Sequence, residues 1–213
     1  MTSKTIELSL DEIFNLAKAS LLKHGANEEN ADAVANTVTN AERDGSLSHG
    51  LFRIPGYIKA LQSKKVDGSA KPEIKEVTPT IFRCDAKNGF APLAHKYSLK
   101  PLIEAAHKFG IAGVAIQRSH HFAALWPEVE TISENGLVGL TSVSYTPAVA
   151  PAGGTTALFG TNPMSFAWPR PGKNPIVFDM ATSSMAKGEI QIAARDGHSV
   201  PLGTGLSSSG ELT

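Results

Sequence analysis

Three side chains that can do chemistry lie close together between residues 44 and 57. Ser48 and His49 are adjacent, and Arg53 follows four residues after the histidine. Histidine gives and takes protons near neutral pH, whereas an arginine guanidinium can hold a carboxylate through two parallel hydrogen bonds. Glycines on both sides of these residues favour a turn over a packed core. The segment therefore predicts a site in which Ser48 and His49 transfer a proton and Arg53 binds a carboxylate.

The backbone of this segment can be interpreted in two ways. In a single helix, His49, Arg53 and Tyr57 would share one face, because they are spaced four residues apart. Pro55 lacks the N–H that an interior helical turn needs, so we expect a tight turn that leads into a helix starting near Pro55. A purely structural interpretation is equally open, in which His49 caps that helix and Arg53 forms a surface ion pair.

Two further groups of polar residues are candidates for binding. His120 and His121 follow an apolar segment, but the sequence has no His-Glu-x-x-His pattern and no paired cysteines, which disfavours a metal site. We expect this loop to lie at the carboxyl end of a strand and to meet a cofactor. Asp179 also ends an apolar segment, where it can bind a hydroxyl group or cap the next turn. Lys187 and Glu189, taken alone, indicate a solvated helix face.

The familiar phosphate-binding and nucleophile motifs are missing from the sequence. No glycine-rich dinucleotide fingerprint follows a strand pattern, no Gly-Lys-Ser/Thr closes a P-loop, and no nucleophile elbow is present. The nearest glycine pattern, at residues 203–205, lies in a tail without periodicity. A hydrolase that uses Ser48 and His49 therefore ranks last among the interpretations of the site.

The composition is typical of a soluble globular protein. An apolar content of 41% in 213 residues is enough for a sizeable core. Twenty basic and twenty acidic residues cancel, which argues against nucleic acid or an anionic membrane as a partner. No apolar run could span a bilayer, and the N-terminus lacks the apolar core of a signal peptide. Cys84 is the only cysteine, so we expect a cytoplasmic protein.

The first 70 residues are predicted to form a helical domain. Ser9 and Glu12 match a capping box ahead of apolar residues at helical spacing. The segment 64–72 is polar and contains glycine and proline, which makes it the best internal boundary in the chain. We therefore predict domains at residues 1–70 and 71–213, with helices in the first at about residues 10–24, 28–43 and 55–62.

The remaining residues alternate between short apolar segments and helical segments. Strands are expected at residues 74–77, 80–84, 111–116, 137–144, 164–168 and 175–178. Helices are expected at residues 93–109, 123–134 and 187–194, with Pro101 as an interruption of the first. This order predicts an α/β (α+β) fold class, with a helical N-terminal domain followed by a mixed-sheet domain.

Five motifs lie in order along the chain. They are Asp44-Gly45 with Ser48-His49-Gly50, Arg53 and Tyr57; Ser119 to Trp126; Val149 to Gly154; Gly160 to Pro163; and Asp179 to Ser183. Together they resemble the malate/L-lactate dehydrogenase family, which is unrelated to the ordinary lactate dehydrogenases, and the resemblance covers essentially the whole chain. Residues 120–126 and 188–195 look most like its branch of Δ1-piperideine-2-carboxylate/Δ1-pyrroline-2-carboxylate reductases.

This resemblance implies an NAD(P)-binding domain that is not a Rossmann fold, with NADPH or NADH as the cofactor and a homodimer as the assembly. It implies a proton relay of Ser48, His49 and Glu189. It also implies a substrate pocket that contains Arg53, Thr161 and Lys187. The residues expected at the dinucleotide are His121, Phe122, Ala123, Ala124, Leu125, Asp179, Met180 and Ala181.

The same resemblance implies an NAD(P)H-dependent reductase of a small cyclic 2-imino carboxylate. Glu189 stands where that branch carries aspartate, and Lys187 where it carries histidine, which leaves a malate- or lactate-type 2-hydroxy acid dehydrogenase open as the alternative. Members of the family are much longer than 213 residues, so we expect a fragment or truncated product. A catalytically incompetent binding or assembly module is therefore the alternative from another functional class.

Overall fold

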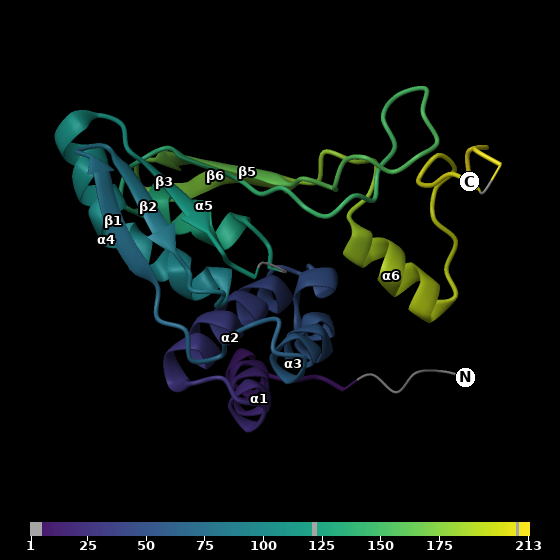
Figure 1. Cartoon of the computed structure of the whole chain (residues 1–213), viewed down its shortest axis with the longest axis horizontal. Coiled ribbons are helices and arrows are strands. Elements are labelled where there is room, and N and C mark those ends of the chain that lie inside the picture. Colours follow the sequence, from purple (N-terminus) through teal and green to yellow (C-terminus); the bar gives the residue numbers. More distant parts are fainter. Residues whose placement is uncertain (1–5, 121–122, 208) are drawn as a thin grey trace. The chain divides into compact units, whose positions relative to one another are not determined.

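The computed structural model describes residues 6–120, 123–207 and 209–213. Contacts within the chain divide it into two compact units, residues 1–124 and residues 125–213. The predicted boundary at residues 70 and 71 lies inside the first unit, where the chain changes from helices to strands (Figure 1). As a domain boundary it stays a prediction.

The first unit begins with three helices whose ends follow from local sequence. Ser9 caps the first helix, and its partner Glu12 completes the predicted capping box. Asn27 caps the second helix by accepting a hydrogen bond from the backbone N–H of Asn30. Pro55 lies in the first turn of the third, as predicted. The bounds are α1 Leu10–Lys23, α2 Glu28–Arg43 and α3 Ile54–Gln62.

The core of these helices is built from small side chains and two large aromatic ones. Alanines and valines line the buried side of α2, which allows α1 and α2 to pack closely. The rings of Tyr57 and Phe90 are fully buried and meet edge to face, with their centroids 5.5 Å apart. Tyr57 lies on α3, so this contact fixes the helix that follows the Ser48-His49 motif.

A three-stranded sheet completes the first unit. Strand β2 lies in the middle, pairing antiparallel with β1 and parallel with β3. The connection between β2 and β3 contains helix α4, which is continuous through Pro101, so the predicted interruption is wrong. Buried residues on both sides of the proline, including Ser98 and Leu102, hold the helix against its neighbours despite the missing N–H. The bounds are β1 Glu73–Thr78, β2 Ile81–Asp85, α4 Ala91–Phe109 and β3 Gly113–Gln117.

Asp85, at the end of β2, is expected to make stability depend on pH. Its carboxylate accepts hydrogen bonds from the Arg118 guanidinium and from the backbone N–H of Lys87, and these lower its pKa to about 2. Because the folded-state pKa is depressed, the stabilisation is complete above the ordinary value of 3.8 and is lost as pH falls toward about 2. Asp85→Asn should therefore lower the midpoint of thermal unfolding at about pH 6, and the difference from the parent should shrink as the pH falls toward 2.

The control for this experiment is Glu76→Gln, which removes an exposed acid from the neighbouring strand β1. It should leave the unfolding midpoint unchanged across the same pH range. A constant difference between Asp85→Asn and the parent at every pH would contradict the role given to the Asp85 carboxylate.

The second unit is a three-stranded antiparallel sheet with one helix packed on its inner face. Strand β5 lies between β4 and β6, and helix α5 contacts all three strands. A further helix, α6, follows the sheet, and no helix or strand is assigned after it in the described residues. The bounds are α5 Trp126–Glu134, β4 Gly139–Ser142, β5 Met164–Arg170, β6 Lys173–Met180 and α6 Lys187–Asp196.

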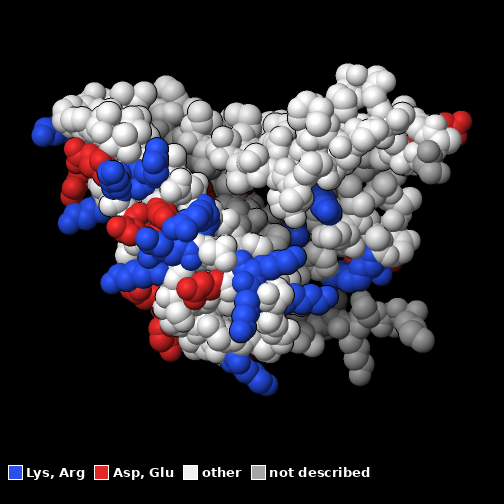
Figure 2. All heavy atoms as spheres, in the orientation of Figure 1, with Lys and Arg blue, Asp and Glu red and all other residues white. Residues whose placement is uncertain are grey.

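The outer face of this sheet is apolar and exposed. Leu140, Phe166 and Phe178 lie side by side across the three strands, and the rings of the two phenylalanines stack with centroids 5.5 Å apart. Figure 2 shows a mostly uncharged surface over β5 and β6. A sheet face of this kind departs from the usual polar outer face of an antiparallel sheet. Its exposed large side chains are Leu140, Trp168, Ile176, Phe178 and Met180.

None of the helices in the described ranges combines the length and the apolar character needed to cross a bilayer.

Candidate active site

The Ser48-His49 motif lies on a short 3-10 turn directly after α2. This turn, η1, spans Leu47–His49, and Ser48 within it is fully buried. The Ser48 Oγ lies 2.9 Å from Nδ1 of His49, and the Ser46 Oγ lies 3.3 Å from the same nitrogen. Two hydroxyl groups therefore converge on one ring nitrogen and orient the half-buried imidazole.

Arg53 ends a second 3-10 turn, η2, which spans Leu51–Arg53. Arg53 is also the N-cap residue of α3, and its side chain makes no capping hydrogen bond. The alternative in which His49 caps this helix is wrong, because Arg53 occupies the cap position. The Arg53 guanidinium carbon lies 5.8 Å from the centre of the Phe52 ring. Burial raises the pKa of the Tyr57 hydroxyl well above its ordinary value, and the nearby Arg53 charge partly offsets this shift.

His120 is connected to the same region through an aromatic contact. Its ring lies 6.5 Å from the ring of Phe90, which in turn packs on Tyr57. Its backbone N–H donates to the carbonyl of Gly89, and its carbonyl accepts from Ala91, so the residue extends the pairing beyond β3. Within the described residues no three histidine, cysteine, aspartate or glutamate side chains are grouped as metal ligands would be.

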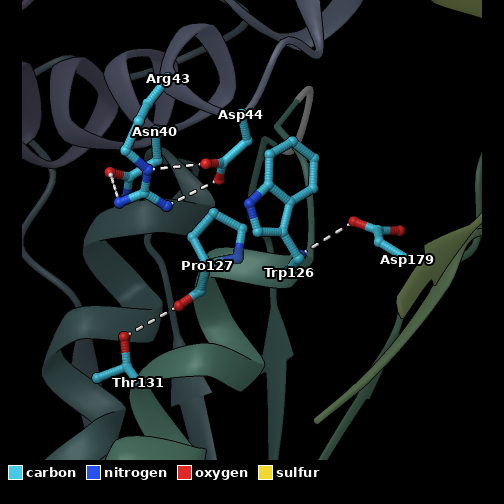
Figure 3. Close-up of polar contacts among 7 residues, drawn as sticks. All are labelled: Asn40, Arg43, Asp44, Trp126, Pro127, Thr131 and Asp179. Carbon is cyan, nitrogen blue, oxygen red and sulfur yellow. Dashed lines mark hydrogen bonds and ion pairs between the residues drawn. The ribbon is translucent and has the colours of Figure 1, made fainter. Parts of the chain in front are cut away.

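Asp179 binds the start of helix α5. One of its carboxylate oxygens, Oδ2, accepts hydrogen bonds from the backbone N–H groups of Leu125 at 2.7 Å and Trp126 at 2.9 Å. Figure 3 shows the carboxylate at the end of β6 directed at the backbone nitrogen of Trp126. The carboxylate thus caps the start of α5, a contact that neither interpretation of Asp179 from the sequence included.

The predicted cofactor residues fall into two segments that meet at this hydrogen bond. The side chains of Ala123, Ala124 and Leu125 are buried, so only their backbone groups could contact a dinucleotide. Met180 is exposed and Ala181 is half-buried. His121 and Phe122 lie outside the described residues. Two segments 54 residues apart in sequence are therefore neighbours at Leu125 and Asp179, which fits the single cofactor that the resemblance assigns to both.

The Asp179 contact should contribute measurably to stability. Asp179→Ala removes a charged acceptor from two backbone N–H groups and is expected to lower the free energy of unfolding by about 1–3 kcal/mol. Asp179→Asn keeps one oxygen acceptor and should lose less. Denaturant unfolding of both variants measures the difference. The control Asp196→Ala removes only an exposed carboxylate that pairs with its neighbour Arg195, and equal stability of Asp179→Ala and the parent would contradict the capping role.

Of the two predicted pocket residues in the second unit, Lys187 lies near Tyr145, and Thr161 is the sequence neighbour of a residue that binds Tyr145. The Lys187 Nζ lies 5.8 Å from the centre of the Tyr145 ring, a cation–π distance. The side chain of Asn162, next to Thr161, accepts a hydrogen bond from the Tyr145 backbone N–H at 2.9 Å. Glu189 lies exposed in the first turn of α6, and its predicted contact with His49 stays a prediction.

Two residues at the site were missed by sequence reasoning. Ser46 could have been found, because it precedes His49 by three residues, a spacing at which side chains on one helical turn meet. Tyr145 carries no such signal, because its contacts involve Asn162 and Lys187, which are distant in sequence.

Known proteins of one family match this chain over nearly its whole length. The family described as "Malate/L-lactate dehydrogenase" matches residues 8–213. A Δ1-pyrroline-2-carboxylate/Δ1-piperideine-2-carboxylate reductase of Pseudomonas aeruginosa is 45% identical over 208 residues, which are 98% of this chain and 62% of that protein. The chain therefore spans about three-fifths of the length of this relative.

Solved structures agree with the sequence comparison. The crystal structure of Δ1-piperideine-2-carboxylate reductase from Pseudomonas syringae pathovar tomato matches with a TM-score of 0.93 and 46% identity, covering 98% of this chain and 63% of that one. A malate dehydrogenase from Entamoeba histolytica matches with a TM-score of 0.92 and 30% identity, covering 98% and 58%. These matches confirm the predicted mixed, non-Rossmann fold class. The chain belongs to the malate/L-lactate dehydrogenase family.

Proposed function

We propose that this chain carries the catalytic motif of an NAD(P)H-dependent reductase that converts a small cyclic 2-imino carboxylate into the corresponding amino acid. The observation that supports this most directly is the contact between Ser48 and His49, four residues before Arg53, in a chain with relatives named for that reaction. The contact gives a proton donor of fixed orientation, four residues before a group that can bind a carboxylate.

Each residue of the motif has one role in the proposed reaction. Arg53 binds the substrate carboxylate through its planar fork. His49 delivers a proton to the imine nitrogen. Ser48 holds the ring through Nδ1, so that the opposite nitrogen, Nε2, can donate that proton. Ser46 shares the orienting role.

The cofactor supplies the second half of the reduction. When bound, a reduced nicotinamide dinucleotide supplies hydride to the carbon next to the carboxylate. The segments proposed to hold it are residues 121–125 and 179–181, joined by the hydrogen bond between Asp179 and Leu125. NADPH and NADH are both proposed as cofactors. Thr161 and Lys187 are proposed to line the substrate pocket, and Glu189 is proposed as the acid of the relay.

A 2-oxo acid is the second candidate substrate. Lys187 leaves this candidate open, because the resemblance places histidine at this position in the imine reductases. The match to a malate dehydrogenase at 30% identity supports the same alternative. A ketone and an imine need the same hydride and proton, so substrate identity depends on the pocket and not on His49.

A substrate panel tests the proposal. Δ1-piperideine-2-carboxylate, Δ1-pyrroline-2-carboxylate and pyruvate are each offered with NADPH and with NADH, and the Pseudomonas syringae reductase serves as the positive control. Turnover of the imines supports the proposed function, whereas turnover of pyruvate alone supports the 2-oxo acid. Absence of turnover together with absence of an NADPH fluorescence change would overturn both and favour a binding or assembly module.

The expected cytoplasmic location and the homodimer stay proposals that rest on the family resemblance and on the single, buried Cys84.

A further inference from the structure

A carboxylate from α2 binds the junction between the two turns that carry the catalytic motif. The Glu42 Oε1 accepts a hydrogen bond from the backbone N–H of Leu51 at 2.7 Å, across nine residues of sequence. Leu51 is the first residue of η2, so its N–H has no partner within that turn. A half-buried carboxylate at this distance makes a charge-assisted hydrogen bond, which is stronger than one between neutral groups.

Gly50 makes this approach possible. A Cβ atom on Gly50 would lie 2.1 Å from the Glu42 Oε1 and 2.5 Å from its Cδ, closer than real Cβ contacts. The φ angle of Gly50 is −86°, so this glycine does not adopt the left-handed conformation that usually favours glycine. A Cβ at this position would occupy the space of the Glu42 side chain and displace its carboxylate.

The end of α2 also holds the start of η1. The backbone N–H of Ser46 donates to the carbonyl of Ala41 at 2.8 Å, and that of Gly45 donates to the carbonyl of Glu42 at 3.1 Å. The turn that carries Ser48 and His49 is therefore fixed to α2 at its start through the backbone and at its end through the Glu42 carboxylate.

We propose that Glu42 is a positioning residue for the reaction. It acts by fixing the junction at Gly50 and Leu51, and thereby the separation between His49 on η1 and Arg53 on η2. Neither the motif nor the family resemblance pointed to this residue. The inference rests on the proposed function for its effect on catalysis, whereas the anchoring contact itself can be tested without turnover.

The first set of variants separates anchoring from charge. Glu42→Ala removes the acceptor and should lower kcat/KM by about 10–100-fold, because small displacements of catalytic groups have effects of this size. Both kcat and KM should change, since His49 and Arg53 are displaced relative to each other. Glu42→Gln keeps an oxygen acceptor and should stay within about 3-fold of the parent. The control is Glu28→Ala, an acid in the first turn of the same helix that pairs with Lys18 on α1.

A second set of variants tests the steric part of the inference. Gly50→Ala should reproduce the Glu42→Ala phenotype, because the added methyl group displaces the carboxylate. Gly56→Ala is the matched control, because a Cβ at Gly56 meets no atom within 4 Å and the residue lies in helix α3. This control should fold and react like the parent.

Nuclear magnetic resonance gives a readout that is independent of turnover. In Glu42→Ala, the Leu51 amide should lose protection from hydrogen exchange and the ring resonances of His49 should shift, while Glu42→Gln should preserve both. If the parent shows no turnover, the proposed function fails, but these signals still decide whether Glu42 anchors the motif. Wild-type kcat/KM and unchanged Leu51 protection in a folded Glu42→Ala variant would overturn the inference. Equal loss in Glu42→Gln and Glu42→Ala would also overturn it, because the charge and not the anchor would then matter.

Discussion

Replacing His49 with alanine is expected to lower kcat by about 10²–10⁴-fold, the usual contribution of a positioned proton donor. The KM for the substrate should change little, because Arg53 and not His49 binds the carboxylate in the proposed reaction. Steady-state kinetics with Δ1-piperideine-2-carboxylate and NADPH measure both constants. The fold should survive, since His49 is only half-buried and lies on a short turn.

The matched control is His24→Ala. His24 follows α1 and contacts the backbone carbonyl of Ser20 through its ring at 2.7 Å, so this substitution also removes a hydrogen-bonded imidazole. It should leave kcat unchanged. Turnover by His49→Ala at the parental rate would exclude His49 as the proton donor, and a loss of similar size in His24→Ala would show that the assay reports stability and not chemistry.

Replacing Arg53 with lysine is expected to raise KM by about 10–100-fold with a smaller effect on kcat. Hydrogen bonds to charged groups are worth about 1.5–3 kcal/mol, and lysine offers a point charge in place of two parallel donors. The positive charge is kept, so the result separates bidentate recognition from simple attraction. Kinetics over a range of substrate concentrations measure the two constants separately.

Arg43→Lys is the control for this substitution. Arg43 forms a bidentate ion pair with the neighbouring Asp44 at the end of α2, and its side chain also reaches Asn40 (Figure 3). Loss of one donor there should not affect KM. An unchanged KM in Arg53→Lys would remove Arg53 from carboxylate binding.

The helices of the first unit could be predicted because their ends are encoded locally. The capping box at Ser9 and Glu12 fixes the start of α1, and the predicted range for α2 matches the structure from Glu28 to Arg43. The turn before Pro55 was also predicted, although its division into η1 and η2 was not. Local hydrogen bonds determine these features, so a short window of sequence contains the information.

Predictions that depended on tertiary packing were less accurate. The interruption at Pro101 was wrong because buried residues on both sides of it keep α4 continuous. The start of α5 was expected at Ala123 but lies at Trp126, where the Asp179 carboxylate caps the helix from 53 residues away. No local pattern at either position contains this information.

In the candidate site, too, local contacts were predicted and contacts between residues distant in sequence were not. The pairing of Ser48 with His49 was predicted from their residue types and from the family resemblance. The contact of Glu42 with Leu51 spans nine residues and depends on the space left at Gly50, so neither residue stood out in the sequence. Roles assigned by resemblance alone, including that of Glu189, stay proposals.

The apolar outer face of the second sheet has a consequence for strand alignment. In most antiparallel sheets, a one-residue slip is prevented because it would bury polar side chains and expose apolar ones. Here the outward-facing Phe178 is as apolar as its inward-facing neighbour Val177, so hydrophobicity alone does not distinguish the two alignments of β6. The two alignments are distinguished by a row of polar residues on the inner face, where Thr141, Ser165 and Asp179 lie opposite one another.

Helix α5 forms hydrogen bonds with two residues of this polar row. Thr141 donates to the Glu128 carboxylate, and Asp179 accepts from the first amides of the helix. A slip of one residue would turn Asp179 outward and leave those amides without their acceptor. The same carboxylate that joins the two proposed cofactor segments therefore also sets the alignment of the strand that carries it.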